Sequence, residues 1–400
     1  MKYFLIILLF LPLQAFAFTT GQNATTVIGH TDFETIGTIH GNTTGDTLYI
    51  PEGVAFDKSG NMWVADTGFN RVLEFSSPFT SGENASKVLG QDNFTSSQAS
   101  LSTDGLDQPY GLTFDKSGNM WVADTNNNRI VEYDSPITSG ESASIVIGSP
   151  SFNKGVYPTS AISLAAPYGI AFDKSGNLWA VDYYDNRILE YVPPFKDGMS
   201  ATLVLGQYSF TDNSDGTSPG SFNLPSSIAF DSSGNLWVTD SLNNRVMKFL
   251  YPFSNHQSAS LVIGQRNFTT NQPGITNDTL NTPYGIAFDA SGNLWVTDGN
   301  NARVLGYYPP FTSGQSASVV LGQQNFAGMH MGTSANALSE PYDVKFDNLG
   351  NLWVADMANN RVVGFETTAV PEFSLSAMAM TLATLCSVSI LTIFGSRLKF

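Results

Sequence analysis

The sequence is poor in cysteine and histidine, and the body of the chain lacks a helical period. It has one cysteine among 400 residues, Cys386, which lies in an apolar stretch near the C-terminus. Disulfide bonds and thiol chemistry are therefore excluded from the body of the chain. Because no run of apolar residues there follows a helical spacing, helical repeat architectures are excluded as well.

Charge is scarce and strongly unbalanced. Only 13% of the residues are charged, and 34 acidic residues against 18 basic ones give a formal net charge of −16. A surface this acidic repels phosphate backbones, so we expect no nucleic-acid partner. The apolar fraction of 42%, with 12% aromatic residues, is instead typical of a folded protein with a large core.

The N-terminus has the pattern of a secretory signal. Lys2 is followed by an apolar run over residues 3–13, and Ala15-Phe16-Ala17 is a small-x-small cleavage site. We therefore expect residues 1–17 to be a signal peptide and the protein to be exported. An uncleaved anchor is the alternative, although the run is short for a bilayer span.

The C-terminus carries a second targeting pattern. Residues 375–394 are apolar and uncharged, and a basic tail over residues 395–400 follows, which predicts a membrane helix with a cytoplasmic tail. Residues 367–374 form a linker that contains Pro371-Glu372-Phe373. This motif with its helix and tail resembles the PEF-type sorting signals of archaeal surface proteins, which implies cleavage and attachment to a lipid. Whether the predicted helix is a plain membrane anchor or part of a sorting signal, we expect a membrane-tethered protein at the cell surface.

Three residue types recur at a fixed spacing of 58. Such a period indicates a solenoid or a propeller. The tryptophans are Trp63, Trp121, Trp179, Trp237, Trp295 and Trp353. The same spacing relates Asp57, Asp115, Asp173, Asp231, Asp289 and Asp347, and also Arg71, Arg129, Arg187, Arg245, Arg303 and Arg361.

The unit over residues 283–307 decides between these architectures. Two β-prone runs flank a tight Ala-Ser-Gly-Asn turn, a third follows a second turn, and a fourth comes after Pro-Pro-Phe-Thr-Ser-Gly. Four short antiparallel strands make one propeller blade. We therefore predict an all-β, six-bladed β-propeller over residues 18–366.

The motifs of this unit carry a family resemblance. Pro-Tyr-Gly-Ile-Ala-Phe-Asp, then Gly-Asn-Leu-Trp-Val-Thr-Asp, then Asn-Arg-Val is similar to the NHL repeat. The Asn-His-Leu triplet of that family is replaced by Asn-Leu-Trp or Asn-Met-Trp, and the present repeats are longer. The resemblance recurs six times over roughly residues 51–366 and implies the propeller fold.

The two ends of the array indicate how the ring closes. The fourth-strand motif stands alone at residues 24–29, before the first full unit, and the last unit lacks its own copy. We expect residues 24–30 to supply the outer strand of the last blade, which removes two exposed sheet edges.

The strictly recurring residues are interpreted as architecture. Asp57 and its equivalents begin a turn, and their carboxylates can accept hydrogen bonds from the N–H groups of that turn. Asp66 and Arg71, with their equivalents, form a carboxylate–guanidinium pair across a second turn. The tryptophans, with Phe56 and its equivalents, are expected in the core between blades.

Function is expected where the copies differ. Six Ser-, Thr-, Asn- and Gly-rich loops share little sequence and are expected on one face of the ring, unless they form a neutral coat. They comprise residues 32–50, 95–108, 150–166, 208–224, 268–282 and 326–340.

Beside these loops we predict a ring of ligand-binding residues at the channel mouth, where tyrosines can stack on a sugar or pack a peptide. The alternative is that the tyrosines only fill gaps between blades. The predicted ring is Glu52, Tyr110, Tyr168, Ser226, Tyr284, Tyr342 and Asp343. Phe69, Tyr183 and Tyr184 are further variable aromatics on that face, and Lys345 is a candidate ion-pair partner of Glu52 or Asp343.

The function predicted from these features is binding of an extracellular protein or glycan, with no catalytic residue assigned. One alternative is a calcium-dependent hydrolase or lyase, since gluconolactonase-like six-bladed propellers hold calcium in the channel; Glu52 and Asp343 would be its ligands. The related amidating lyases use zinc and histidines, but the four histidines here occupy different repeat positions, so no zinc site is predicted. A structural envelope component is the remaining alternative.

Overall fold

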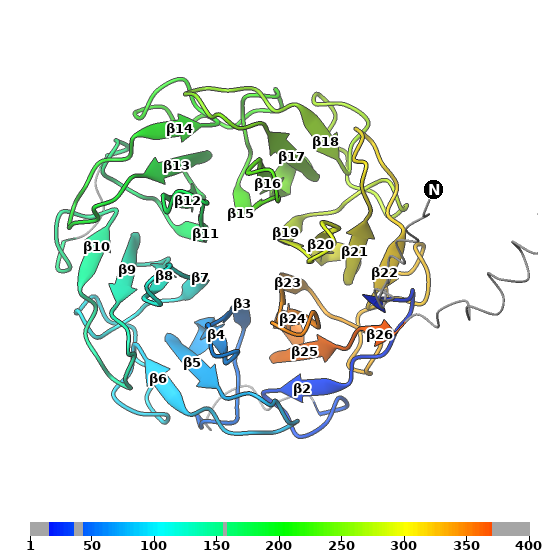
Figure 1. The fold of residues 1–400 in the computed structure, drawn as a ribbon, viewed down its shortest axis with the longest axis horizontal. Coiled ribbons are helices and arrows are strands. Elements are labelled where there is room, and N and C mark those ends of the chain that lie inside the picture. The colour runs from blue at the N-terminus through cyan, green and yellow to red at the C-terminus, as the bar shows by residue number, and fades with distance from the viewer. Residues whose placement is uncertain (1–15, 36–42, 155–157, 370–400) are drawn as a thin grey trace, which may run out of the picture. The chain divides into compact units, whose positions relative to one another are not determined.

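Each 58-residue repeat folds as one four-stranded antiparallel sheet in the computed structural model, which describes residues 16–35, 43–154 and 158–369. Six such sheets stand around a central axis in the unit Thr19–Glu366 (Figure 1). The first strand of every sheet lies nearest the axis (Figure 1). The predicted all-β, six-bladed propeller is therefore confirmed, and no α-helix occurs among the described residues.

The blades are numbered along the chain, and each is given from its inner to its outer strand. Blade 1 comprises β3 (Pro51–Phe56), β4 (Met62–Asp66), β5 (Arg71–Phe75) and β6 (Lys87–Leu89). Blade 2 comprises β7 (Pro109–Phe114), β8 (Met120–Asp124), β9 (Arg129–Tyr133) and β10 (Ile145–Ile147). Blade 3 comprises β11 (Pro167–Phe172), β12 (Leu178–Asp182), β13 (Arg187–Tyr191) and β14 (Leu203–Leu205).

The second half of the ring repeats this order. Blade 4 comprises β15 (Pro225–Phe230), β16 (Leu236–Asp240), β17 (Arg245–Phe249) and β18 (Leu261–Ile263). Blade 5 comprises β19 (Pro283–Phe288), β20 (Leu294–Asp298), β21 (Arg303–Tyr307) and β22 (Val319–Leu321). Blade 6 comprises β23 (Pro341–Phe346), β24 (Leu352–Asp356), β25 (Arg361–Phe365) and β2 (Thr26–Ile28). Short 3-10 turns follow the second strand at η1 (Thr67–Phe69), η2 (Ser241–Asn243), η3 (Gly299–Asn301) and η4 (Met357–Asn359).

Strand β2 closes the ring as the sequence predicts. It pairs antiparallel with β25, with Val27 opposite Val363, so the N-terminal segment completes blade 6 (Figure 1). The segment before β2 also contacts blade 5, because the Gly21 amide donates to the Val320 carbonyl at 3.1 Å. The equivalent bond joins blades 1 and 6, because the Gly82 amide of blade 1 donates to the Val27 carbonyl of β2. The closing segment thus reproduces the contacts between blades found elsewhere in the ring.

The core lies between neighbouring blades. All six tryptophans are at most 3% exposed, and each packs against at least one aromatic ring of the following blade. Trp353 of blade 6 contacts Phe79 of blade 1 with ring centroids 4.9 Å apart, edge to face. The tryptophan edge also reaches the turn of its own blade, where the Trp353 Nε1 donates to Asp347 at 3.0 Å. One indole therefore links a turn to the packing between two blades.

The turn between the first two strands forms for a local reason. In blade 1 the Asp57 carboxylate accepts the backbone N–H groups of Ser59 and Asn61 at 2.8 and 2.9 Å. Gly60 adopts φ +86°, which residues with a side chain rarely do. The Asp-x-Ser-Gly-Asn pattern thus determines a tight turn, as interpreted from the sequence. These turns together define the turn face of the propeller.

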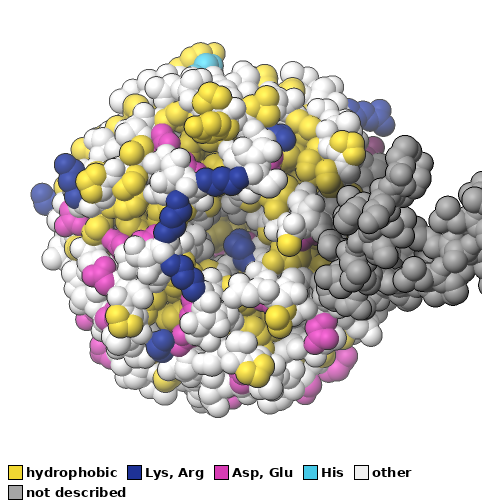
Figure 2. Space-filling view, viewed as in Figure 1, with side chains coloured by type: hydrophobic (Ala, Val, Ile, Leu, Met, Phe, Trp, Pro, Cys, Tyr) yellow, Lys and Arg dark blue, Asp and Glu magenta, His cyan; other side chains and the backbone are white. Residues whose placement is uncertain are grey.

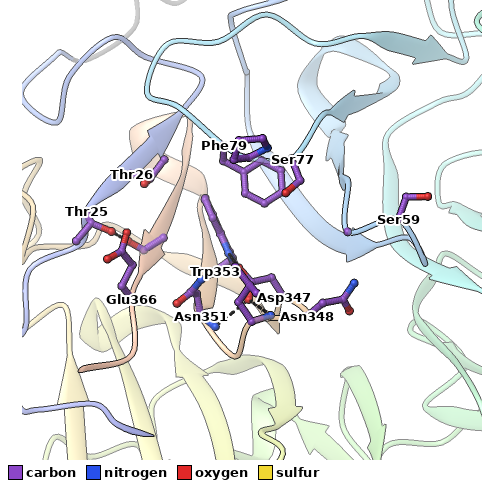
Figure 3. A pocket seen from close by; sticks show the side chains of 14 residues that line it. Thr25, Thr26, Ser59, Ser77, Phe79, Asp347, Asn348, Asn351, Trp353 and Glu366 are labelled. Carbon is purple, nitrogen blue, oxygen red and sulfur yellow. Dashed lines mark hydrogen bonds between the residues drawn. The ribbon is translucent and has the colours of Figure 1, made fainter. Parts of the chain in front are cut away.

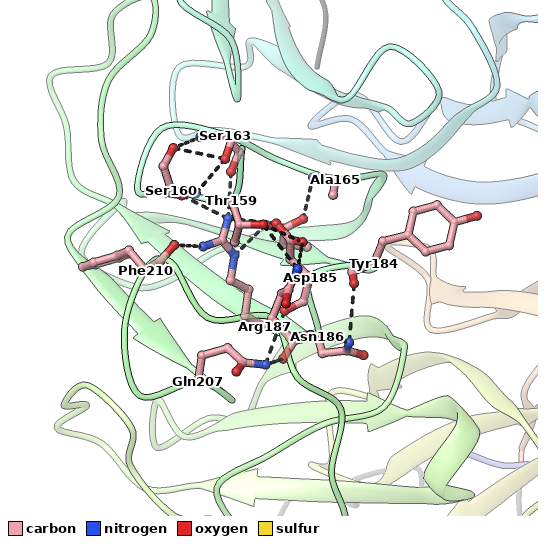
Figure 4. Close-up of polar contacts among 12 residues, drawn as sticks. Thr159, Ser160, Ser163, Ala165, Tyr184, Asp185, Asn186, Arg187, Gln207 and Phe210 are labelled. Atoms are coloured by element: carbon pink, nitrogen blue, oxygen red, sulfur yellow. Dashed lines mark hydrogen bonds and ion pairs between the residues drawn. The ribbon is translucent and has the colours of Figure 1, made fainter. Parts of the chain in front are cut away.

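The repeated arginines anchor the long loops. In blade 3 the Arg187 Nε donates to Asp182 at 2.7 Å, and both side chains are fully buried. The remaining guanidinium N–H groups donate to the carbonyls of Ser160 and Ser163, each at 3.0 Å, and of Phe210 (Figure 4). One arginine therefore holds the loop before its own blade and the loop after it. Since the pair recurs in every blade, all six loops have fixed bases.

A second unit comprises the two chain ends. Its described residues include β1 (Phe16–Ala17), which pairs antiparallel with β26 (Thr368–Ala369). Residues 1–15 of the predicted signal peptide, the Pro371-Glu372-Phe373 motif and the predicted helix over residues 375–394 lie outside the described residues. Within residues 16–35, 43–154 and 158–369, no helix is long and apolar enough to cross a membrane.

Candidate functional site

The long loops and the turns between the second and third strands meet at one end of the propeller, here called the loop face. In blade 1 the Gly68 amide of the turn donates to the Tyr49 carbonyl of the loop at 2.8 Å. In blade 3 the Tyr183 amide donates to the Ala166 carbonyl at 3.3 Å. The inner strands begin at this end, so the predicted channel-mouth residues lie on the loop face.

Glycine follows four of the six ring positions, as Gly53, Gly111, Gly169 and Gly285, and the crowding of the inner strands explains it. A Cβ atom on Gly53 would lie 1.9 Å from the Tyr110 carbonyl oxygen, and one on Gly111 would lie 2.3 Å from that of Tyr168. Real Cβ atoms do not approach backbone so closely, so these positions exclude side chains. The Pro-Tyr-Gly motif therefore lets neighbouring inner strands pack directly against each other.

Five tyrosine rings form a continuous arc across the channel mouth. The ring centroids of Tyr183 and Tyr168 are 4.1 Å apart, and those of Tyr168 and Tyr110 are 4.3 Å apart, both stacked. Tyr110 meets Tyr342 at 5.7 Å, and Tyr342 stacks on Tyr284 at 3.9 Å. We call these five residues the tyrosine arc. Four of them come from the predicted ring, and Tyr183 is contributed by a turn.

The arc is built into the scaffold but not fully covered. Tyr110 is only 3% exposed, whereas the other four rings are half-buried. Gly299 makes room for one end, since a Cβ there would lie 2.6 Å from the Tyr284 ring. Tyr184 continues the aromatic surface beyond Tyr183 and is 64% exposed. The rings therefore both fill space between blades and present a surface at the mouth.

Glu52 lies beside the tyrosine arc. Burial raises the pKa of its carboxyl to about 8. The Thr67 hydroxyl has one hydrogen, and the Pro109 carbonyl lies 2.6 Å from its oxygen and takes that hydrogen. A neutral Glu52 can therefore donate its own proton to the Thr67 oxygen. Burial therefore favours the protonated form of this carboxyl.

The arc tyrosines are poor acids in this setting. Burial raises the pKa of Tyr183 to about 12 and raises the pKa of Tyr110 well above its usual range, with nearby Glu52 contributing to both shifts. The Tyr110 hydroxyl is buried and has no hydrogen-bond partner in the structure. An unmatched buried hydroxyl is costly in a folded protein. The mouth therefore combines neutral phenols, one of them unsatisfied, with a protonated carboxyl.

Ser226 and Asp343 of the predicted ring are buried and bond to neighbouring blades. Ser226 is fully buried and donates to the Tyr284 carbonyl of the next blade at 2.8 Å. Asp343 accepts the Val54 N–H across the ring closure at 3.1 Å and the Lys345 ammonium at 2.7 Å. Both residues therefore join neighbouring blades. Of the two partners considered for Lys345, Glu52 and Asp343, the structure shows an ion pair with Asp343.

The channel below Tyr110 is a cavity of about 290 Å³. It is lined by small residues of the inner strands, such as Gly169 and Ala229, together with the Asp343–Lys345 pair. Seen from the side drawn in Figure 2, the centre of the ring is hollowed, and a basic side chain lies within the hollow. Lys345 is the one basic residue that lines this cavity. Tyr110 is the one arc residue that borders it, and the other four arc tyrosines do not line it.

The histidines are dispersed among the described residues. His30 is buried and contacts the Asn359 carbonyl at 3.0 Å, and His256 stacks on Tyr208 at 3.7 Å. His330 lies in the loop before blade 6, and His40 lies outside the described residues. Within residues 16–35, 43–154 and 158–369, no group of three His, Cys, Asp or Glu side chains is placed to hold a metal ion.

A notch between blades 6 and 1 was not anticipated. It has a volume of about 320 Å³ and is bounded by Trp353 and Phe79, with Asp347, Asn351 and Glu366 at its polar side (Figure 3). Gly364 leaves one wall without a side chain, whereas Glu or Lys occupies the equivalent position in blades 1–4. The equivalent notch between blades 1 and 2, beside Glu74, has a volume of about 250 Å³. A Cβ on Gly364 would lie 2.9 Å from the Trp353 ring. Because an equivalent notch exists beside Glu74, this glycine by itself does not reveal it in the sequence.

Comparisons with known proteins agree with the repeat architecture. Residues 106–133, 222–249 and 280–307 match the NHL repeat. The chain is 17% identical to a solved structure from Bacteroides thetaiotaomicron described as of unknown function, with a TM-score of 0.55. That match covers 87% of this chain and 76% of the other, and at this identity it shows the fold alone. The fold and the repeats thus define a six-bladed β-propeller that contains NHL repeats.

Two relatives with established names match much of the propeller. Peptidyl-glycine alpha-amidating monooxygenase A of Xenopus laevis is 23% identical over 273 residues, which are 67% of this chain and 25% of that protein. Peptidyl-alpha-hydroxyglycine alpha-amidating lyase 1 of Drosophila melanogaster is 25% identical over 234 residues, or 53% of this chain and 40% of the lyase. The chain thus spans less than half the length of either relative.

Proposed function

We propose that this propeller is a binding module whose ligand, an extracellular protein or glycan, engages the loop face at the tyrosine arc. The observation that carries the proposal is the unbroken contact of five tyrosine rings across the channel mouth. Tyrosine offers a large, rigid apolar surface with a polar tip, and it is enriched where proteins bind their partners.

The anchoring of the loops supports the same proposal. Buried arginines such as Arg187 fix the bases of all six loops, so the surface around the mouth is organised before a ligand arrives. A preorganised surface loses little conformational entropy on binding. Export and attachment to the cell surface would expose this face to envelope components. Export and attachment are themselves predictions made from the two ends of the chain.

Two equally exposed tyrosines provide the test. Tyr184 is 64% exposed beside the tyrosine arc, and Tyr251 is 65% exposed in the connection between β17 and β18. We expect Tyr184→Ala to weaken binding of the purified protein to fractionated envelope polysaccharide or protein about 3- to 30-fold. Tyr251→Ala should leave the affinity unchanged. Equal losses in both variants, or none in either, would refute a ligand site on the loop face.

A lyase or hydrolase acting at the same mouth is the second candidate. The named relatives include an amidating lyase, and a carboxyl held protonated at neutral pH is suited to general acid catalysis. The calcium-dependent form of this candidate would use Glu52 and Asp343. Lys345, which lies 2.7 Å from the Asp343 carboxylate, disfavours it. Conversion of a peptidyl-α-hydroxyglycine by the purified protein, lost in Glu52→Gln, would favour the enzyme over the binding module.

A further inference from the structure

The third-strand residue opposite each tryptophan determines how the indole is covered at the turn face. In blade 6 this residue is Gly364, which lies opposite Trp353. A Cβ atom on Gly364 would lie 2.9 Å from the ring, so a side chain at this position would rest on the indole. Glu or Lys occupies the position in blades 1–4. Without such a side chain, Trp353 is 3% exposed, whereas the other five tryptophans are at most 1% exposed.

Two other blades place a lysine ammonium group over the equivalent tryptophan. In blade 4 the Lys248 Nζ lies 5.0 Å from the Trp237 ring centroid and 3.2 Å from the Asp231 carboxylate. In blade 1 the ammonium comes from the fourth strand, since the Lys87 Nζ lies 5.5 Å from the Trp63 ring centroid. An ammonium group within about 6 Å of a tryptophan ring is attracted to its face. The position over the indole therefore accepts an ammonium group from either strand.

The notch between blades 6 and 1 has the acidic and aromatic parts of this arrangement but no ammonium group. Asp347 occupies the position of the carboxylate that pairs with lysine in blade 4. Glu366 adds a second carboxylate at the exposed edge of the notch (Figure 3). No lysine or arginine lines the notch, and among the described residues neither carboxylate forms an ion pair. Lys58, from the adjacent turn of blade 1, donates instead to the Lys116 carbonyl of blade 2.

Blade 6 also departs from the other copies at the rim of the notch. Leu349 lines the notch and is 81% exposed, and serine occupies its position in the other five turns. Blade 5 likewise has a glycine opposite its tryptophan, Gly306, but it has Tyr308 where blade 6 has Glu366. An acidic pocket with an exposed apolar rim suits a lysine, whose alkyl stem packs on apolar surface while its ammonium group reaches a carboxylate.

We propose that the notch between blades 6 and 1 is a docking site for a lysine side chain of a partner protein. The ammonium group lies over Trp353 and pairs with Asp347 and Glu366, and the partner's surface rests on Leu349. The partner thus supplies the group that the chain's own lysines supply in blades 1 and 4. The net charge of −16 attracts basic partners over a distance. This surface belongs to the turn face, and the inference goes beyond the function proposed for the loop face.

The first test fills the notch from within. Thr26 lines the notch and occupies the fourth-strand position that Lys87 has in blade 1. Thr26→Lys should bring the chain's own ammonium group over Trp353 and increase the folding equilibrium constant about 2- to 10-fold, measured by denaturant titration. The control is Thr211→Lys, which adds the same side chain at an exposed position of the loop before blade 4 and should leave the constant unchanged.

The second test uses the peptide acetyl-Ala-Lys-Ala-amide, titrated into the purified protein and followed by ligand-observed NMR. We expect it to bind about tenfold more tightly than the same peptide with norleucine in place of lysine. Thr26→Lys should lower the peptide affinity about tenfold, because the notch is then filled, and Glu366→Gln should lower it about 2- to 10-fold. Thr211→Lys should bind the peptide like the unaltered protein. n-Butylamine, which has the ammonium group without a peptide, should bind about threefold more weakly than the lysine peptide or less.

Several outcomes would overturn the docking site. Equal binding of the lysine and norleucine peptides, or unchanged peptide affinity in Thr26→Lys or in Glu366→Gln, excludes a lysine in the notch. A folding equilibrium constant lower in Thr26→Lys than in Thr211→Lys would show that an ammonium group does not fit over Trp353. Equal affinities for n-butylamine and the peptide would assign the notch to a free amine and overturn the protein partner. Envelope binding that depends on Tyr184 tests the loop face separately, so either proposal can fail alone.

Discussion

The residue before the first strand of every blade has an uncommon backbone conformation. In all six copies it precedes a proline and has a positive φ: Ile50, Gln108, Ala166, Leu224, Thr282 and Glu340. In five copies its N–H donates to an asparagine of the preceding blade, as Thr282 does to Asn244 at 2.7 Å. In the sixth copy Ala302 stands where the asparagine would be and itself has φ +51°. Blade 5 therefore has both a strained alanine and a missing bond.

Ala302→Asn should stabilise the protein. Asparagine tolerates a positive φ better than alanine, and its side-chain oxygen can accept the Glu340 N–H. We expect the free energy of unfolding to increase by about 1–2 kcal/mol, measured by denaturant titration. The matched control, Asn244→Ala, should lower it by a similar amount. A destabilised Ala302→Asn variant would show that the sixth position cannot accommodate the side chain.

Glu52 should make stability depend on pH. Its pKa is about 8 in the folded protein and near the ordinary value of 4.5 in the unfolded chain. Between these values the folded state binds more protons, so the free energy of unfolding falls as pH rises from 5 to 8. We expect this decline to be steeper in the unaltered protein than in Glu52→Gln by up to about 1.4 kcal/mol per pH unit.

Comparing the unaltered protein with Glu52→Gln separates the effect of Glu52 on stability from the effects of other carboxyl groups. Burial also raises the pKa of Glu132, to about 7, but that residue titrates equally in both proteins. Unfolding curves recorded at intervals from pH 5 to 9 supply the measurement. Parallel pH profiles for the two proteins would mean that Glu52 is ordinarily solvated in solution.

At the scale of elements, the six long loops share a common anchoring at their bases. Their sequences share little, yet buried arginines hold equivalent backbone carbonyls in each loop, at Ser160 and Ser163 in blade 3 and at Ser218 and Ser221 in blade 4. Backbone carbonyls can be bound whatever side chain they carry. The loops therefore vary in sequence while their bases keep one conformation, as the proposed binding face would require.

Strand β2 should contribute strongly to stability. Val27 is fully buried on β2 and lies opposite Val363 of β25. Val27→Asp places an unpaired charge in this core, and we expect the free energy of unfolding to fall by about 3–5 kcal/mol. The melting temperature should decrease by roughly 10 °C.

Asn23→Asp is the control for the closing strand, because Asn23 is exposed just before β2. It adds the same charge and should leave the melting temperature within about a degree. If Val27→Asp melts like the control, β2 does not close the ring in solution, and blade 6 has a free edge.

At the scale of the whole molecule, six similar blades produce an asymmetric site. Blade 1 contributes Glu52, blade 4 contributes Ser226, and blades 2, 3, 5 and 6 contribute tyrosines to the same level of the channel mouth. Because all six positions surround one axis, a change in one blade alters a site shared by all. A repeat protein can therefore keep its scaffold uniform while single substitutions define the ligand.

The sequence by itself determined the architecture. A period of 58 residues, turn residues at constant positions and a solitary fourth-strand motif at residues 24–29 were enough to predict six blades and the closing strand. These features are local or strictly repeated, and each repeat must bury the same apolar face. The membrane helix and the sorting motif, predicted from the same sequence, concern residues that the structure does not describe.

Only the tertiary structure decided what the departures from the repeat do. The sequence placed Glu52, Ser226 and Asp343 in one ring, but it could not show that Ser226 and Asp343 bond to neighbouring blades while Glu52 hydrogen-bonds with Thr67 of its own blade. Nor could it show that Tyr183, from a turn, stacks on Tyr168. Such contacts join residues of different blades, and their geometry follows from the closure of the ring rather than from any local pattern.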